Sequence, residues 1–285
     1  MARGGMSRLK NALWAGAVLA IPIGQGNAAD LGDVSLKDTG GDKLTVTGSV
    51  AGVTDYIFRG ISQNRRDPTV QGNLDATYGI FYVGTFASGV NFADKYALFD
   101  PQANLEWDMY GGIRPKWGDL TFDFGVIAYI YPGERIDHSF GYFQQTYVEF
   151  KVGVSATVFK DLALSGTVYV SPDYNSETGT TVDVEGTASK PLFSLHGVDV
   201  AASGTIGHLS YESTYAPAVP GSPLVRLHDY TYWNLGVTGT WNTHYSLDLR
   251  WWDTADLGVG KAPAGSDSSF LQSGSTFAAT VKYSF

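Results

Sequence analysis

Hydrophobic and polar residues alternate along most of this chain with a period of two. Leu105 and Trp107, for example, alternate with Glu106 and Asp108. Successive side chains on a strand point to opposite faces, so the pattern predicts a strand with one apolar and one charged face. The last nine residues repeat the alternation and stop at an aromatic side chain, as expected of a final strand with one face against lipid.

The same alternation marks twelve segments of the chain. They cover residues 44–59, 68–78, 80–90, 104–114, 119–131, 142–155, 161–170, 179–189, 198–208, 227–241, 243–254 and 274–285. An even count is typical of a single-chain bacterial barrel whose two ends lie on the periplasmic side. The sequence therefore predicts an all-β fold, a closed antiparallel transmembrane β-barrel of about 12 strands over residues 44–285.

The lengths of the connections provide an independent test of that prediction. With the first strand running outward, the external connections are long and the inward ones are short, with 190–197 as the exception. Transmembrane barrels have short periplasmic turns and longer external loops, whereas a soluble β-sandwich has no reason to keep this asymmetry. The pattern therefore favours the barrel over the sandwich.

The N-terminus has the features of an export signal. Three basic residues precede an apolar run, 12–23, which is followed by small residues at the positions that a signal peptidase reads. The run has 12 residues, short of the roughly 20 that a helix needs to span a bilayer. We expect a cleaved signal peptide over 1–28, a short periplasmic segment over 29–43, and location in the cell outer membrane. Met1 and Met6 both stay open as the start.

Composition and charge narrow the classes of function. No later apolar run reaches the roughly 18 residues of a membrane-spanning helix, and the chain has no cysteine. Loss of the signal peptide removes three of the 19 basic residues and none of the 28 acidic ones, so the net charge of −9 becomes −12. A chain this acidic is not expected to bind nucleic acid.

The inner face of the predicted barrel is polar and mixed in charge. Its charged residues are Asp55, Arg59, Asp75, Glu106, Asp108, Arg114, Asp123, Glu149, Lys151, Asp183, Glu185, Asp248, Arg250 and Lys282. They could line a water-filled path that sorts solutes by charge, or pair across the interior and fill it. Twelve strands lie between the ~8 that are filled and the ~16 that leave a wide channel, so size leaves both open.

Aromatic residues near the predicted strand ends suit membrane-interface girdles, which anchor a barrel at both lipid boundaries. Those that we assign to the girdle and to the C-terminal assembly signal are Trp233, Trp241, Trp251, Tyr283 and Phe285, with Tyr131, Tyr245 and Trp252 at similar positions. We therefore expect outer-membrane lipid, lipopolysaccharide and the barrel-assembly machinery as partners. Arg65 and Arg66 could bind a lipopolysaccharide phosphate, although two adjacent loop arginines are weak evidence and a solvated loop accounts for them better.

One stretch is more specific than the general barrel pattern. It reads Thr-Asp-Tyr-Ile-Phe-Arg-Gly-Ile-Ser-Gln over 54–63, followed by Asp-Pro-Thr-Val-Gln-Gly over 67–72 and Gly-Ile-Phe-Tyr-Val-Gly-Thr-Phe-Ala-Ser over 79–88. This stretch resembles the N-terminal signature of the TorF-family porins, with Thr54 in place of a serine and Phe86 in place of a tryptophan. The resemblance implies an outer-membrane protein grouped with porins and implies no solute and no catalytic residue.

Asp55 and Arg59 of this signature are four residues apart on the predicted first strand. Their side chains would emerge on the same face about 13 Å apart, too far for a direct pair. Each is then expected to contact a neighbouring strand, at Gln71, Asn73 or Asp75. Whether the two residues set the strand register or bind a solute stays open.

Signals for catalysis and for cofactors are weak. A serine nucleophile needs a base within hydrogen-bond reach, and His208 with Ser210 is the only close pair. No two histidines have the spacing of a helical zinc site, and Asp253, Asp256 and Asp267 lack the dense spacing of a calcium loop. We expect no enzymatic activity, no cofactor and no metal.

The sequence therefore favours a porin-like channel for passive diffusion of small hydrophilic solutes or ions. The excess of acidic residues suggests a preference for cations. A filled structural or surface-binding barrel and an outer-membrane hydrolase remain as alternatives.

Overall fold

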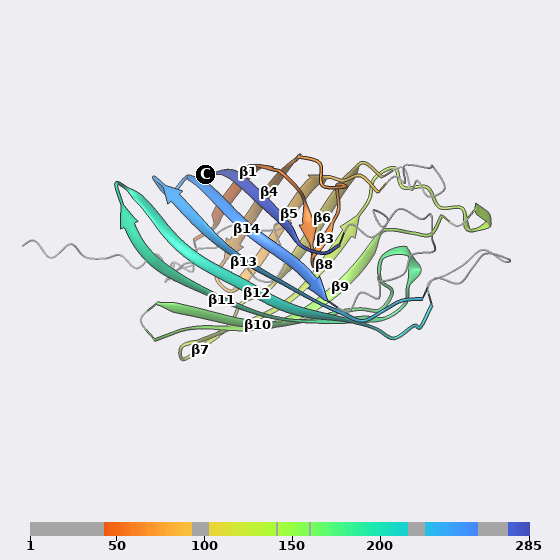
Figure 1. Ribbon diagram of the computed structural model, residues 1–285. Coiled ribbons are helices and arrows are strands. Elements are labelled where there is room, and N and C mark those ends of the chain that lie inside the picture. The colour runs from red at the N-terminus through yellow and green to blue at the C-terminus, as the bar shows by residue number, and fades with distance from the viewer. Residues whose placement is uncertain (1–42, 93–102, 141, 160, 216–225, 256–272) are drawn as a thin grey trace, which may run out of the picture.

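The computed structural model describes residues 43–92, 103–140, 142–159, 161–215, 226–255 and 273–285. Twelve long strands in these residues form one closed, antiparallel wall (Figure 1). They are β1 (Thr45–Val53), β4 (Thr69–Tyr78), β5 (Phe81–Gly89), β6 (Leu105–Ile113), β8 (Leu120–Ile130), β9 (Tyr147–Val158), β10 (Leu162–Ser171), β11 (Thr181–Leu195), β12 (Val198–Tyr211), β13 (Tyr230–Trp241), β14 (Tyr245–Ala255) and β15 (Thr276–Ser284). The first and last strands pair with each other, Val50 opposite Tyr283, which closes the ring.

The predicted fold class is therefore confirmed. The signal peptide and the periplasmic segment lie outside the described residues and stay predictions. The remaining elements are short: β7 (Lys116–Trp117) in an inner turn, the pair β2 (Ile57–Phe58) and β3 (Ile61–Ser62), and two 3-10 helices, η1 (His138–Phe140) and η2 (Asn175–Glu177). No helix among the described residues is long and apolar enough to cross a membrane.

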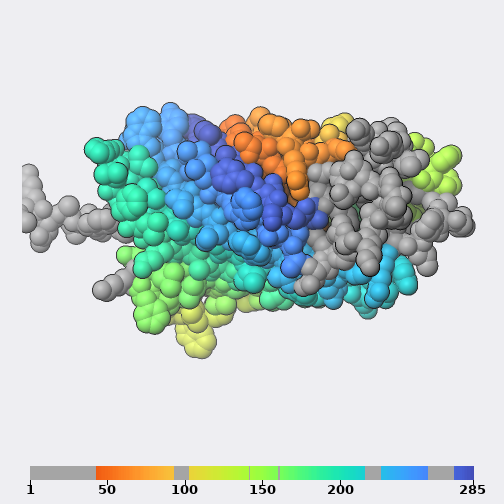
Figure 2. Space-filling view, in the orientation of Figure 1, coloured from red at the N-terminus to blue at the C-terminus, as the bar shows by residue number. Residues whose placement is uncertain are grey.

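The outside of the barrel is apolar and the inside is polar, the reverse of a soluble protein. Large apolar side chains are exposed on every wall strand, as Val70 on β4, Phe150 on β9 and Val281 on β15 illustrate. Figure 2 shows the side chains of β11 to β15 packed side by side across one face of the barrel. A surface of this kind is stable against lipid, and a closed wall leaves no unpaired strand edge there.

Short and long connections lie at opposite ends of the barrel (Figure 1). The expected exception at 190–197 is corrected by the structure, because β11 continues to Leu195 and the turn consists of His196 and Gly197 alone. Both turn residues have positive φ, 49° and 80°, as in the two-residue hairpin turns that match strand twist. Pro191 is accommodated at a register shift, where a proline costs no ladder bond.

The first predicted strand is also corrected. The alternation predicts a strand over 44–59, but β1 ends at Val53 and residues 54–63 leave the wall. β2 and β3 pair with each other as a small antiparallel hairpin, with Ile57 opposite Ser62. We call residues 54–63 the inner hairpin. Thr54 fixes its start, because its N–H donates to the Ala279 carbonyl at 2.9 Å and its hydroxyl accepts from the Ala279 N–H at 2.9 Å.

Gly60 allows the inner hairpin to turn. Arg59 and Gly60 have φ of 48° and 77°, and a Cβ on Gly60 would lie 2.4 Å from Thr254 Cγ2 and 2.9 Å from Tyr232 Cβ. Gly60→Ala therefore adds both backbone strain and a clash, and we expect it to displace the hairpin and to lower the midpoint of unfolding in urea. Gly79→Ala is the matched control, because it also has positive φ, 58°, but nothing within 4 Å of its Cβ. Equal losses in the two variants would contradict close packing around Gly60.

Candidate functional site

The inner hairpin lies inside the barrel and is almost completely buried. Tyr56 is 1% exposed, Ile57 0%, Phe58 7% and Arg59 0%. Inside a transmembrane barrel, such burial means that the segment is enclosed by the wall strands on all sides. A segment of the N-terminal signature therefore occupies the lumen instead of forming part of the wall.

Contacts of the inner hairpin reach wall strands all around the ring. The Tyr56 ring lies 6.2 Å from Phe86 on β5, and its hydroxyl donates to Glu106 on β6. The Phe58 ring lies 5.8 Å from Tyr129 on β8. On the other side, hydrophobic side chains of the hairpin pack against β12 to β15: Ile57 with Trp252 and Ala278, and Ile61 with Leu209, Tyr230 and Tyr232. The hairpin thus fills the cross-section of the lumen at its own level.

Arg59, at the tip of the hairpin, is the central residue of the site. Its Nη1 and Nη2 lie 2.7 and 3.0 Å from the two carboxylate oxygens of Glu149, a bidentate pair. Its Nε lies 2.9 Å from Asp183 Oδ2, an ion contact that is not aligned as a hydrogen bond. The guanidinium carbon also lies 5.2 Å from the Tyr169 ring centre and 5.9 Å from that of Tyr174. Such a position suits cation–π attraction.

More carboxyl groups surround Arg59 than its guanidinium contacts. Glu185 on β11 lies two residues beyond Asp183, and the Tyr232 hydroxyl, 2.8 Å from Asp183 Oδ2, is placed to donate to both carboxylates. Among the described residues, Asp183 Oδ1 and Glu185 Oε2 have no hydrogen-bond partner, although both residues are buried. These two oxygens are acceptors that neither Arg59 nor Tyr232 uses.

A second acidic pair, Glu106 and Asp108 on β6, lies near the hairpin and is equally buried. Glu106 accepts hydrogen bonds from the hydroxyls of Tyr56 and Tyr131, the latter at 2.8 Å. Asp108 Oδ1 has no hydrogen-bond partner among the described residues. The interior is therefore acidic on this side as well.

The other charged residues predicted for the lumen lie in smaller networks on the wall. Asp123 contacts Arg114 and Lys151, each at 3.1 Å, and accepts from the Tyr82 hydroxyl at 2.8 Å. Asp75 accepts from the Tyr110 hydroxyl and from the Asn73 amide. Arg250 on β14 donates to Asp248, Asn234 and Ser203, and Lys282 on β15 is half-buried. These networks bind wall strands to one another.

The expected positions of Asp55 and Arg59 were wrong. They do not share a face of the first strand, and they do not contact Gln71, Asn73 or Asp75 as expected: Arg59 spans to Glu149 and Asp183, while Asp55 Oδ1 accepts from the Ser62 hydroxyl at 2.5 Å within the hairpin. Asp55 thus fastens the base of the hairpin, and Arg59 fastens its tip.

Two aromatic residues considered for the girdle lie in the lumen instead. Trp252 is 0% exposed and packs against the inner hairpin, and Tyr131 is 4% exposed and bonds to Glu106. The aromatic side chains assigned to the girdle are all exposed. Trp233 and Trp251 lie in the parts of β13 and β14 nearer the long connections, and Trp241, Tyr283 and Phe285 lie at the end with the short turns. The face of the wall to which a side chain points, more than its closeness to a strand end, separates the two groups.

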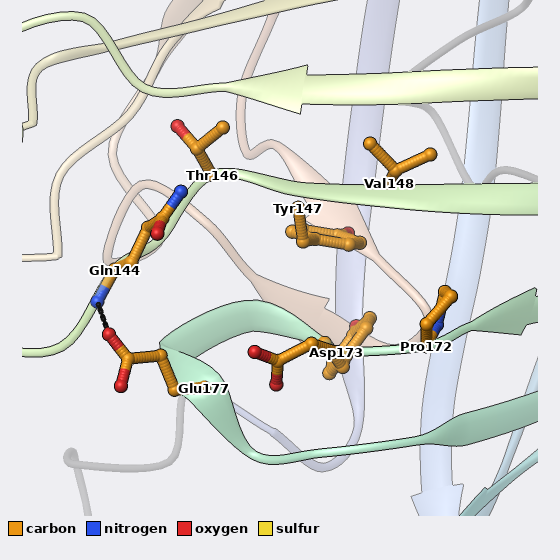
Figure 3. Close-up of a pocket in the computed structure, with 8 residues that line it drawn as sticks. Gln144, Thr146, Tyr147, Val148, Pro172, Asp173 and Glu177 are labelled. Carbon is orange, nitrogen blue, oxygen red and sulfur yellow. Dashed lines mark hydrogen bonds between the residues drawn. The ribbon is translucent and has the colours of Figure 1, made fainter.

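A pocket of about 260 Å³ opens at the end of the barrel that has the long connections. It lies between the start of β9 and the connection that follows β10, where Figure 3 shows Tyr147 and Asp173 on opposite sides of the space. Tyr174 also lines it. The Tyr147 ring stacks 4.4 Å from Tyr129, whose hydroxyl donates to Glu149 at 3.0 Å. Aromatic rings thus separate this pocket, which we call the mouth pocket, from the Arg59 site.

Glu177 closes one end of the mouth pocket. Its carboxylate lies 2.8 Å from His138 Nε2 and accepts from the Gln144 N–H at 3.1 Å (Figure 3). Partial burial raises the pKa of Glu177, but the hydrogen bonds from His138 and Gln144 outweigh burial and hold that pKa below its usual range. The Glu177 side chain is therefore ionised at neutral pH.

The histidine and acidic residues considered for catalysis or metal binding lie outside the lumen where the structure describes them. His208 is exposed, and its Nδ1 lies 3.0 Å from Thr231 Oγ1. In the part of the chain that the structure describes, no cluster of three or more histidine, aspartate or glutamate residues is placed to hold a metal ion. Asp256 and Asp267, considered for calcium, lie outside the described residues.

Comparison with solved structures reveals the same fold in known porins. The KdgM porin matches with a TM-score of 0.52 and 7% identity, over 85% of this chain and 99% of that chain. Its complex with disordered oligogalacturonate matches with a TM-score of 0.51 and 6% identity over the same shares. The NanC porin matches with a TM-score of 0.48 and 10% identity, over 84% and 98%. At these identities, the KdgM matches show the fold alone: this chain is a porin-type transmembrane β-barrel.

No curated protein sequence matches this chain. The resemblance to the TorF-family porins and its signature therefore stay a prediction. A family model described as "Bacterial protein of unknown function (Gcw_chp)" matches residues 37–285, nearly the whole of the predicted mature chain. On that match, the chain belongs to the Gcw_chp family of bacterial proteins.

Proposed function

We propose that this protein is a porin-like channel of the outer membrane for passive diffusion of small hydrophilic solutes or ions, with a preference for cations. One observation carries the proposal: a closed barrel of porin type encloses charged side chains, of which nine are acidic and five are basic. Rows of fixed charge inside a pore favour ions of the opposite sign. In the structure, the inner hairpin blocks this path.

The acidic residues of the interior also bear on the charge of the solute. Oligogalacturonate, present in the KdgM complex, is a chain of carboxylate-bearing sugars. Repulsion from Glu106, Asp108 and Glu185 would oppose its passage through this barrel. We therefore propose solutes that are neutral or positively charged.

The exterior supports the location and the partners of the channel. Exposed apolar strands between two aromatic girdles suit the outer membrane, with its lipid and lipopolysaccharide and the barrel-assembly machinery as partners. Lipopolysaccharide binding through Arg65 and Arg66 stays a prediction. We propose no enzymatic role, no cofactor and no metal.

The preference for cations can be tested in planar bilayers under a potassium chloride gradient. The chain in which residues 55–62 are replaced by a Gly/Ser linker should show a reversal potential on the cation side. Adding Glu106→Gln and Asp108→Asn should move that potential toward zero, because both substitutions remove negative charge from the lumen. Asp137→Asn is the matched control, since Asp137 lies in an external connection. If the full chain and the linker variant both fold and neither conducts a current, the filled structural or surface-binding barrel would be favoured instead.

A further inference from the structure

The Arg59 site has the composition of a binding site for an organic cation. One planar guanidinium is held by the bidentate pair with Glu149 and the contact with Asp183, while the rings of Phe58, Tyr169 and Tyr174 lie 4.7, 5.2 and 5.9 Å from its central carbon. Carboxylates in fork geometry together with aromatic faces are the groups that recognise guanidinium.

The guanidinium bound at this site belongs to the chain itself and is carried by the inner hairpin, which is separate from the wall. Glu149 and Asp183 lie on β9 and β11 of the wall, whereas Arg59 lies at the tip of the inner hairpin. The wall therefore supplies the whole acidic half of the site, and the hairpin supplies the cation. Asp183 Oδ1 and Glu185 Oε2, buried and without a hydrogen-bond partner among the described residues, show that Arg59 does not use all of the acceptors.

We infer that Arg59 is an internal substitute for the solute, and that the channel takes solutes that bear a guanidinium or a similar planar cationic group. Such a solute competes with Arg59 for Glu149, Asp183 and Glu185 and favours the state in which the hairpin has left the site. This inference deepens the proposed function, because it names the class of solute for the same lumen.

The mouth pocket lies on the route that such a solute would follow. Asp173 and Glu177 place negative charge at the entrance, and Tyr174 lines the pocket while its ring also lies near the Arg59 guanidinium. A cation entering from the end with the long connections thus meets acidic and aromatic groups before it reaches Glu149. The hairpin tether gives Arg59 a high effective concentration, so a weakly binding free cation displaces it only in part.

Binding is tested most directly in the variant Arg59→Ala. The substitution leaves Glu149 and Asp183 in place and removes atoms that ethylguanidinium matches in size and charge. We expect the variant to melt at a lower temperature than the unaltered chain and millimolar ethylguanidinium to recover at least half of the lost melting temperature, because a ligand that binds the folded state stabilises it. Ethylammonium, with the same charge and no planar fork, should recover much less.

Two matched controls define the result. The unaltered chain should be stabilised by ethylguanidinium much less than Arg59→Ala is, because the tethered Arg59 competes for the site. Arg59→Ala with Glu149→Gln should lose the recovery, because the bidentate partner is gone. Equal effects of ethylguanidinium and ethylammonium, or no effect of either, would overturn the inference.

A second measurement covers the case in which Arg59→Ala does not fold. Ethylguanidinium should reduce the current through the chain with the Gly/Ser linker at 55–62 by half or more at millimolar concentration, and Glu149→Gln should abolish this block. A block that ignores Glu149→Gln would overturn the inference. Conduction tests the proposed channel function. The recovery of the melting temperature tests the guanidinium site and needs no conduction, so the two proposals can fail separately.

Discussion

Replacing residues 55–62 with a Gly/Ser linker of equal length should raise the conductance of the barrel by about an order of magnitude or more. The physical reason is that the replaced segment touches wall strands on all sides of the lumen, through Tyr56, Ile57, Phe58 and Ile61 as well as Arg59. A linker without these side chains cannot fill the same volume. Single-channel recordings of the two chains in planar bilayers at equal salt measure the difference.

The control for this prediction is a second linker of the same length in another connection. Residues 132–139 belong to the connection between β8 and β9 and lie outside the inner hairpin, so their replacement should leave conductance close to that of the unaltered chain. Folding of each variant can be followed by the shift in electrophoretic mobility on heating. If the linker at 55–62 gives a folded barrel that conducts no better than the unaltered chain, the inner hairpin is not what closes the lumen.

The wall of this barrel could be predicted from the sequence because lipid imposes a strict rule on every strand. On β6, for example, Trp107 must face lipid and Asp108 must not, so the alternation is visible without any knowledge of the partner strands. Boundaries were less certain: β9 begins at Tyr147, five residues after the expected start at 142, and β11 runs past Pro191 to Leu195. The expected turn at 190–197 included Pro191, but a register shift accommodates this proline within the strand.

The inner hairpin was missed because it continues the alternation of β1. Its residues are as apolar as those of a strand. Inside the lumen, no contact with lipid requires apolar and polar positions to alternate. Two signals were nevertheless present in the sequence. The expected first strand had 16 residues, well above the roughly 10 that a barrel strand needs. Gly60, between apolar Phe58 and Ile61, is a residue type that two-residue hairpin turns favour. The partners of Arg59 could not be found this way, because they depend on which strands face each other across the barrel.

Glu149→Ala should be among the most destabilising single substitutions in the wall. It removes the bidentate partner of a fully buried arginine and leaves Arg59 with Asp183 as its remaining ion contact. Breaking a buried pair by removing one partner typically costs about 3–5 kcal/mol, because the other charge stays buried. Tyr129 also loses the acceptor of its hydroxyl. Unfolding in urea from lipid vesicles, followed by tryptophan fluorescence, measures the loss in the free energy of unfolding.

Asp248→Ala is the matched comparison, because it removes a carboxylate from a second buried arginine of the lumen. Arg250 keeps acceptors on Asn234, at 2.6 Å, and on Ser203, at 2.9 Å, so its loss should be clearly smaller. The double variant Arg59→Ala with Glu149→Ala should lose less than the sum of the two single variants, because neither charge is then left without the other. The contrary result is that Glu149→Ala lowers the free energy of unfolding no more than Asp248→Ala and that the losses in the double variant simply add. The Arg59–Glu149 pair then does not fasten the hairpin, and the place of the hairpin in the lumen must depend on apolar packing around Ile57 and Phe58.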